Sequence, residues 1–206
     1  MSTIIRDVLR YYITDRRKLT AGVRIEDVVA ANLLAEVDFI QLREKDLPAR
    51  ELFKLVERVL ALPNPQGTKI LINGRVDVAL ASGAHGVHLP SQSPPPNAWP
   101  RFGLNEPGLI WGVSCHTVAE VQQAEQQGAD YVLFGPVFAP LSKASDLAPR
   151  GLPDLQKAAQ AVRIPVLALG GITEQNSIAC MAHGAAGVAG ITLFQTGFRT
   201  GAWRAC

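Results

Sequence analysis

The sequence predicts an α/β protein with a single (β/α)8 TIM barrel that spans residues 1–206. Strand-like apolar runs alternate with helical patterns along the chain, which is typical of βαβ units and a parallel sheet. Polar residues follow most of these strands instead of gathering at one switch point, and the last two strands end in glycine, in "LALGGIT" and "GVAGIT". Loops in these two places often bind phosphate in such barrels. A doubly wound sheet is the alternative, but the chain has no G-x-G-x-x-G or G-x-x-x-x-G-K-[ST] motif.

The expected elements follow one another with little room between them. Buried parallel strands read as nearly continuous apolar runs, as "YVLFGP" and "VLALGG" do. The expected strands are Tyr11–Thr14, Phe39–Arg43, Lys69–Asn73, Gly86–Leu89, Ile110–Ser114, Tyr131–Gly135, Val166–Gly170 and Gly187–Ile191. The expected helices are Arg24–Glu36, Ala49–Leu62, Arg75–Ala81, Val118–Gln127, Pro153–Val162 and Gln175–His183. The Pro-rich connection from Leu89 to Ile110 is expected to be irregular, with at most a short helix.

Composition narrows the class of partner. The net charge of +2 offers no overall polycation for nucleic acid or a membrane surface, so neither partner is expected and any anion site must be local. No stretch approaches about 18 uninterrupted apolar residues, and the N-terminus lacks a long apolar segment. Three widely spaced cysteines without a C-x-x-C motif suggest neither a disulfide framework nor a zinc site. These features predict a cytoplasmic protein.

The stretch "FIQLREK" is the strongest candidate for ligand binding. Side chains alternate along a strand, so Gln41, Arg43 and Lys45 share one face. An amide, a guanidinium and an ammonium group together suit a phosphate or pyrophosphate at the open end of the barrel. The alternative is an internal salt bridge of these cations with Glu44 or Asp46.

Three further residues end strands on the same expected rim. Asn73 offers both a donor and an acceptor, whereas Arg75 and Asp77 after it suggest an ordinary surface pair. Ser114 and His116 share a face, with Ser114 a candidate ligand contact and His116 either catalytic or bonded to the loop.

Other residues near the rim have structural interpretations. Cys115 points the opposite way from Ser114, toward a helix, which argues against a Cys-His nucleophilic pair. Thr117 and Glu120 form the pattern of a helix capping box. His85 and His88 are not expected to face together as metal ligands.

The last rim segments offer main-chain N–H groups and a lysine on a long connection. Gly170 and Gly171 predict a phosphate cradle of backbone N–H groups, or alternatively tight strand–helix packing. The long connection 134–152 is typical of a lid, from which Lys143 would fold over a bound anion, or it is a solvated surface loop.

Taken together, the motifs resemble the thiamine-phosphate synthase/TenI family. They occur in the family's order along nearly the whole chain: "YYITDR", "FIQLREK", "INGRVDVAL", "GVHLP", "GVSCHTVAE", "GADYVLFGPVF", "IPVLALGGITEQN" and "GAAGVAGI". The resemblance implies a TIM barrel, often a homodimer, that handles thiazole phosphate. In the synthase branch, which couples a pyrimidine pyrophosphate to thiazole phosphate with Mg²⁺, it places pyrophosphate contacts on Gln41, Arg43, Lys45, Asn73, Ser114 and Lys143. It places thiazole-phosphate contacts on the main chain of Gly170, Gly171, Ile191 and Thr192.

Two departures favour the TenI branch, which performs a thiazole tautomerisation without a metal. The synthase pattern has aspartates where this chain has Gly74 and the loop 90–93, "PSQS", so the expected Mg²⁺ ligands are absent and no metal or other cofactor is expected. The histidine of the TenI pattern is replaced by Pro136, which leaves His116 and then Lys143 as candidate acid/base residues. The leading hypothesis is a metal-independent, TenI-like thiazole tautomerase. The alternatives are a divergent Mg²⁺-dependent thiamine-phosphate synthase and a catalytically inactive binding protein.

Overall fold

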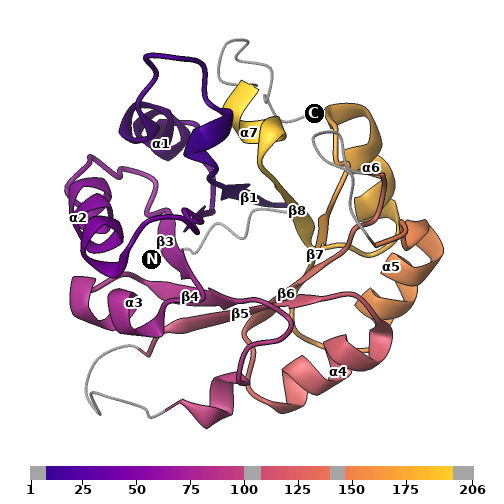
Figure 1. Ribbon diagram of the computed structural model, residues 1–206. Helices are drawn as coiled ribbons and strands as arrows, with labels where there is room; N and C mark the ends of the chain where they lie inside the picture. Colours follow the sequence, from indigo (N-terminus) through magenta and orange to yellow (C-terminus); the bar gives the residue numbers. More distant parts are fainter. Residues whose placement is uncertain (1–7, 100–107, 140–146, 197–206) are drawn as a thin grey trace.

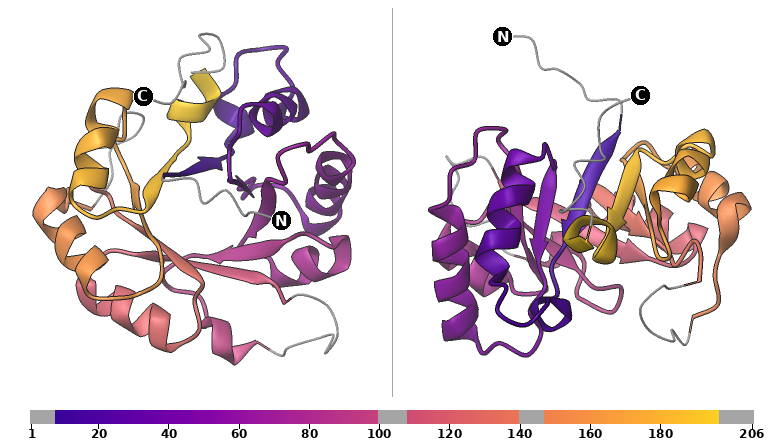
Figure 2. Two further views of the ribbon diagram at one scale, coloured as in Figure 1. Left: turned by 180° about the vertical axis from the view of Figure 1, so that it is seen from behind. Right: turned by 90° about the horizontal axis from the view of Figure 1, so that it is seen from above.

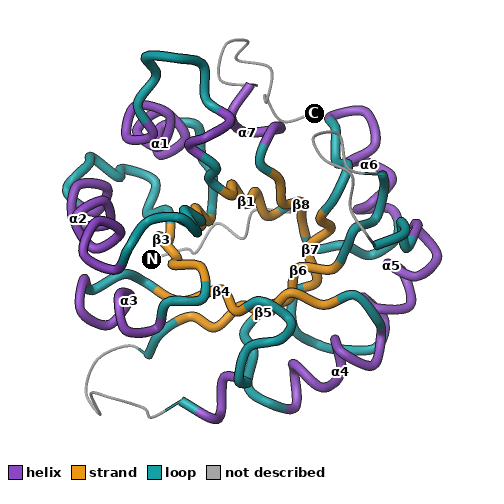
Figure 3. The backbone as a smooth tube through the Cα atoms, viewed as in Figure 1, coloured by secondary structure: helices purple, strands orange, loops and turns teal. Residues whose placement is uncertain are grey.

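In the computed structural model, eight parallel strands close into a barrel in chain order, which confirms the predicted fold. The structure describes residues 8–99, 108–139 and 147–196. Figure 1 looks along the barrel axis, and Figure 3 shows the ring of strands with helices outside it. The strands are β1 (Leu9–Ile13), β2 (Phe39–Leu42), β3 (Lys69–Asn73), β4 (Gly86–Leu89), β5 (Ile110–Cys115), β6 (Tyr131–Phe134), β7 (Val166–Leu169) and β8 (Gly187–Gly190).

Six helices run back outside the strands, and the two further views in Figure 2 show them surrounding the barrel. They are α1 (Ile25–Leu34), α2 (Ala49–Leu60), α3 (Val76–Ser82), α4 (Val118–Gln126), α5 (Gly151–Gln160) and α6 (Glu174–Ala182), and the short α7 (Thr192–Thr196) follows β8. Two 3-10 turns, Arg16–Lys18 and Pro96–Ala98, complete the elements of the described residues. The second lies in the Pro-rich connection between β4 and β5, as expected. No helix within these described ranges combines the length and apolar character needed to cross a bilayer.

The predicted boundaries differ by one or two residues at several strand ends. β1 begins two residues early, at Leu9, because Leu9 and Arg10 pair in register with Gly187 and Val188 of β8. β7 ends one residue early because Gly170 has a φ of +96°, which lies outside the strand region. Local pattern cannot place such ends, since the neighbouring strand decides where pairing stops.

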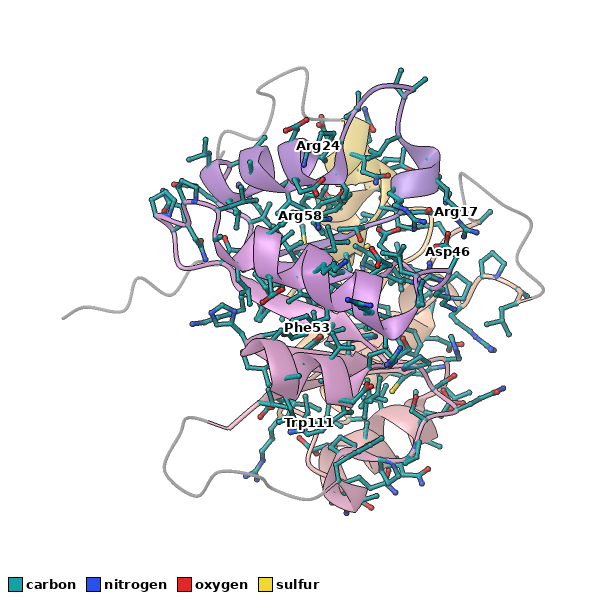
Figure 4. All side chains as sticks on the ribbon, turned by 60° about the vertical axis from the view of Figure 1, so that its left-hand side comes forward. Arg17, Arg24, Asp46, Phe53, Arg58 and Trp111 are labelled. Atoms are coloured by element: carbon teal, nitrogen blue, oxygen red, sulfur yellow. The ribbon has the colours of Figure 1, made fainter. Side chains whose placement is uncertain are left out.

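The outward faces of the strands form the main core against the helices. Cys115 lies in this layer at 1% exposure, beside Val121 of α4 and Phe134 of β6, which confirms its predicted direction. Burial raises the pKa of the Cys115 thiol to about 12, so the group is a neutral, inert core residue. At the junction of α1 and α2, Glu26 binds Arg24 at 3.4 Å and Arg58 at 2.8 Å, and Figure 4 shows both arginines there.

Aromatic rings and glycines fill the inside of the barrel. Tyr11, Phe39 and Tyr131 form a cluster in which each pair of ring centroids is 5.6 Å apart. Tyr131 can occupy the centre because its neighbour across the ladder is Gly112, where a Cβ atom would overlap the Tyr131 ring and hydroxyl. The absence of a side chain at Gly112 therefore determines where the Tyr131 hydroxyl lies.

We expect Gly112→Ala to lower the free energy of unfolding by about 1–3 kcal/mol, because the added methyl group overpacks the barrel interior. Urea unfolding measures this change. Gly108→Ala is the matched control, since no atom lies within 4 Å of a Cβ at Gly108. Equal stability of the two variants would show that the interior adjusts freely around Tyr131.

Candidate functional site

A threonine–glutamate contact positions the two cations that follow β2. Thr14, after β1, donates through Oγ1 to Glu44 Oε1 at 2.6 Å and accepts from the main-chain N–H of Arg43 at 3.0 Å. Glu44 is buried at 4% exposure. This contact holds the turn that presents Arg43 and Lys45 at the carboxyl end of the barrel.

The carboxylates beside these cations bind a different arginine. Arg16 Nη1 lies 3.2 Å from Glu44 Oε2 and 2.7 Å from Asp46 Oδ1, and Arg17 lies at the same edge, as Figure 4 shows for Arg17 and Asp46. The predicted alternative, a salt bridge of Arg43 or Lys45 with Glu44 or Asp46, is therefore wrong. Among the described residues no carboxylate pairs with Arg43 or Lys45. The Arg43 charge, followed by partial burial, lowers the pKa of Lys45, as expected for two neighbouring cations without a counterion.

Replacing Lys45 should have opposite effects on binding and stability. Lys45→Gln removes one charged donor, so we expect inorganic phosphate to bind about 10-fold more weakly. The same change removes the repulsion by Arg43, so the free energy of unfolding without phosphate should stay level or rise by a few tenths of a kcal/mol. Calorimetric titration and urea unfolding measure the two quantities. Lys54→Gln, on α2, is the control, and loss of stability with unchanged phosphate binding would make Lys45 a structural residue.

Gln41 and Asn73 are brought together directly. Gln41 Nε2 donates to Asn73 Oδ1 at 2.7 Å, and Gln41 is 1% exposed inside the barrel. Asn73 is half-buried and reaches the rim at the end of β3. Arg75 and Asp77 form the exposed pair that the sequence predicted, with Arg75 Nε donating to Asp77 Oδ1 at 2.8 Å.

Ser114 and His116 both lie at the end of β5, with different partners. Ser114 Oγ lies 2.8 Å from Nε2 of His88, and Ser114 is half-buried. His116 Nδ1 hydrogen-bonds to the main-chain carbonyl of Gly135. A carbonyl only accepts, so in the neutral imidazole form of His116 the proton is on Nδ1 and the lone pair is on Nε2. No described residue contacts that Nε2 by a hydrogen bond.

The helix after His116 is capped in a different way from the predicted capping box. Thr117 Oγ1 accepts from the N–H of Glu120 at 3.2 Å, as expected. The Glu120 carboxylate accepts from the N–H of His116 instead of that of Thr117. Glu120 therefore fixes the main chain of His116 as well as the helix start.

Gly170 and Gly171 have a packing role that the sequence allowed for. Both have positive φ, +96° and +64°, and a Cβ at Gly170 would lie 2.6 Å from Pro136 Cα. A Cβ at Gly171 would lie 2.8 Å from Phe138 Cβ. The close partner is the segment after β6 and not a helix. No described residue accepts from the N–H groups of the two glycines, so a phosphate-binding role for them stays a prediction.

Of the remaining predicted contact residues, two are placed on the rim by the structure, and one lies outside the described residues. Ile191 and Thr192 follow β8 at the same rim, where α7 begins. Lys143 lies in 140–146, outside the described residues. The base of that connection is tied to the neighbouring strand, because the N–H of Val137 donates to Leu169 O at 2.8 Å and that of Phe138 to Gly170 O at 3.0 Å.

The two positions of the expected metal-binding aspartates lie close together. Gly74 has a φ of +65°, and a Cβ there would meet Pro90 Cδ at 3.5 Å. The loop from Pro90 to Ser93 supplies hydroxyl and amide groups but no carboxylate. Within 8–99, 108–139 and 147–196, no group of three or more His, Cys, Asp or Glu side chains is arranged to hold a metal ion. These donors do not fit Mg²⁺, which prefers carboxylate oxygens.

A cavity of about 150 Å³ opens beside Ser114. One wall is the segment from Leu89 to Pro96, and the other comes from α4, including Glu120 and Gln123. Its lining includes Cys115 and Ala124 of the outer core, and it includes none of Arg43, Lys45, Asn73, His116, Gly170 and Gly171, so the cavity lies apart from the predicted rim site.

Three functional candidates were missed from the sequence: Tyr11, His88 and Tyr131. Each is at most 3% exposed, and their polar atoms meet inside the barrel. The signal was present, because two-residue alternation puts Gly86 and His88 on one face of β4. The register with β5 then places His88 opposite Gly112. His88 was considered only as a metal ligand beside His85, whose Nδ1 instead accepts from the N–H of Ile70 at 3.1 Å.

Comparison with known proteins covers most of the chain. The family model described as thiamine monophosphate synthase matches residues 10–194. The thiamine-phosphate synthase of Roseiflexus castenholzii is 44% identical over 183 residues, 88% of this chain and 78% of the relative. That of Moorella thermoacetica is 39% identical over 182 residues, 88% of this chain and 85% of the relative. A solved structure, the thiamine phosphate pyrophosphorylase from Pyrococcus furiosus, has a TM-score of 0.79 and 31% identity, covering 94% of this chain and 90% of that one.

Proposed function

Because this chain belongs to the thiamine-phosphate synthase/TenI family, we propose that it is a thiamine-biosynthesis enzyme that binds a thiazole phosphate and moves a proton on the ring without a metal. The observation that carries the proposal is the donor set at the rim. It combines cationic, amide and hydroxyl groups with an available histidine nitrogen, and it lacks carboxylates at Gly74 and at 90–93. In this proposal the enzyme is a TenI-like thiazole tautomerase.

The phosphate group would lie between the cations and the glycine main chain. Arg43 and Lys45 have no carboxylate partner among the described residues, so a bound phosphate supplies the missing counterion. The N–H groups of Gly170 and Gly171 are donors without a described acceptor. The hydroxyl of Ser114, at the end of β5 on the same rim, would donate to the same phosphate.

His116 is the group that we expect to move the proton. Its Nε2 lone pair takes a proton from a ring carbon, which forms an imidazolium, and His116 then returns a proton at a second position of the same ring system. The reaction is a tautomerisation, so atoms balance and neither an oxidant nor a reductant is needed. The Gly135 carbonyl accepts from Nδ1–H throughout and stabilises the cationic ring.

A second candidate, a thiamine-phosphate synthase, is favoured by the names of the relatives and by the match at Gln41, Arg43 and Asn73. Coupling would release pyrophosphate, whose charge a divalent ion stabilises in the synthase pattern. The rim residues do not fit that ion, so we rank coupling second.

The two reactions are separated by incubating the protein with each substrate set, with and without Mg²⁺, and following products by mass and absorbance. We expect tautomerised thiazole carboxylate phosphate, at equal rates with and without Mg²⁺. Mg²⁺-dependent formation of thiamine phosphate would replace this proposal with the synthase. Tight binding of thiazole phosphate without any product would identify a binding protein instead.

The homodimer expected from the family resemblance stays a prediction, which light scattering of the purified protein tests.

A further inference from the structure

A continuous chain of hydrogen-bonding side chains crosses the inside of the barrel from one rim residue to another. It begins at Asn73 and Gln41, whose amides are 2.7 Å apart. Tyr11 Oη lies 3.2 Å from Gln41 Oε1 and 2.8 Å from Tyr131 Oη. Tyr131 Oη lies 3.1 Å from His88 Nδ1, and His88 Nε2 lies 2.8 Å from Ser114 Oγ. Six side chains from six strands thus join Asn73 to Ser114.

The middle members of this chain each hold a single proton. Burial, and for Tyr11 also the neighbouring Tyr131, raises the pKa of both phenols well above their ordinary value. Burial, followed by the charge of Arg43, lowers the pKa of His88 to about 3. Tyr11, Tyr131 and His88 are therefore neutral at physiological pH, and each has only one N–H or O–H to donate.

Because each of these three side chains has one proton to donate, the series from Asn73 to Ser114 has only two arrangements in which every hydrogen bond is made. In the first, every donor points toward Asn73. Ser114 donates to His88, His88 to Tyr131, Tyr131 to Tyr11, and Tyr11 to Gln41 Oε1. Gln41 Nε2 then donates to Asn73 Oδ1. In the second, every donor points toward Ser114. Turning both amides over exchanges their O and N atoms and preserves every distance, so the same side-chain positions serve both arrangements.

The two arrangements present opposite groups at the rim. In the first, Asn73 offers N–H to a ligand, and the Ser114 oxygen offers only lone pairs. In the second, Asn73 offers its carbonyl oxygen, and Ser114 offers O–H because His88 Nε2–H donates to its oxygen. A change at one rim residue therefore requires a change at the other, five hydrogen bonds away along the relay.

We propose that this interior relay couples Asn73 to Ser114, so that an anion at Ser114 reverses the whole chain and makes Asn73 a hydrogen-bond acceptor. His88, Tyr131 and Tyr11 are positioning residues in this scheme. Unprotonated phosphate oxygens only accept hydrogen bonds, so they select the arrangement in which Ser114 donates. The ligand's other end must then offer a donor, such as an amino or N–H group, to Asn73. The inference deepens the proposed function and rests on its anion site.

The tautomer of His88 reports in which direction the side chains of the relay donate their hydrogen bonds. In ¹⁵N NMR of the full-length protein, we expect the His88 proton on Nδ1 without ligand and on Nε2 at saturating inorganic phosphate. His85 is the internal control, because its Nδ1 accepts from Ile70 N–H and so its proton stays on Nε2 throughout. Phosphate that binds without moving the His88 proton contradicts the relay and leaves the proposed anion site intact. Absence of phosphate binding contradicts both.

Two variants test the hydrogen-bonded relay in the absence of any ligand. Tyr131→Phe removes the acceptor of His88 Nδ1, and Tyr11→Phe frees the Tyr131 proton to donate to that same nitrogen. Both should place the His88 proton on Nε2 before phosphate is added. A purely structural role of Tyr11, which does not touch His88 by a hydrogen bond, would leave the tautomer unchanged, and that result would overturn the relay.

Coupling also predicts how rim variants combine. In the wild-type background, the effects of Asn73→Ala and Ser114→Ala on phosphate affinity should differ from additivity by about 5-fold or more. In the Tyr11→Phe background the two effects should be additive, because phenylalanine at position 11 interrupts the hydrogen bonds that connect Asn73 to Ser114. Additivity in both backgrounds contradicts the relay.

Discussion

His116→Gln is expected to lower the rate of thiazole tautomerisation by about 10²–10⁴-fold, the usual contribution of a general acid/base. Glutamine can still donate to the Gly135 carbonyl, so the loop stays in place, but it has no basic nitrogen. Phosphate affinity should stay close to wild type, because in the proposed site Arg43 and Lys45, and not His116, bind the anion. Absorbance of the aromatised product at saturating substrate measures the rate.

The control for this variant is Glu120→Gln. Its amide oxygen can still accept from the N–H of His116, so the main chain keeps its position and the rate should fall far less. Full activity of His116→Gln would show that the base is elsewhere, and Lys143 is then the next candidate.

The stability of the protein should fall steeply as the pH drops from about 6.5 to 3, because of His88. Its pKa is about 3 in the folded protein against 6.5 for an ordinary histidine. Between these values the unfolded chain binds the proton and the folded protein does not, so acid favours unfolding. One pKa unit corresponds to about 1.4 kcal/mol, so the free energy of unfolding should fall by roughly 3–5 kcal/mol across this pH range.

Urea unfolding of wild type and His88→Gln across this pH range measures the effect. Glutamine can replace both hydrogen bonds without titrating, so this part of the pH dependence should disappear. Leu71→Ala, another change inside the barrel, is the control: it should lower stability at every pH and keep the wild-type slope. Identical slopes for wild type and His88→Gln would contradict the buried neutral histidine.

Several elements could be predicted because their causes are local. Strand alternation correctly placed Gln41 inside the barrel and Cys115 in the outer core. Helix starts also depend on nearby residues, as at α6, where Thr173 forms a capping box with Asn176. Strand ends such as that of β1 could not be placed to the residue, because pairing with β8 decides them.

The site was predicted only in part, for the same reason. Rim residues such as Asn73 and Ser114 follow apolar runs, so their place on the barrel could be read from the chain. The pairing of Glu44 with Arg16 could not, because it joins two loops 28 residues apart. Nor could the contact of Tyr11 with Tyr131, which are 120 residues apart.

The amino-acid sequence alone determined the barrel, the family and the side chains that reach its rim, because alternation along a strand and the order of strands are properties of neighbouring residues. Only the tertiary structure decided which side chains meet at the barrel axis. Closing eight strands into a ring brings Tyr11, His88 and Tyr131 together around the space left by Gly112. Distances across the axis depend on the register of every strand at once, and no local pattern contains them.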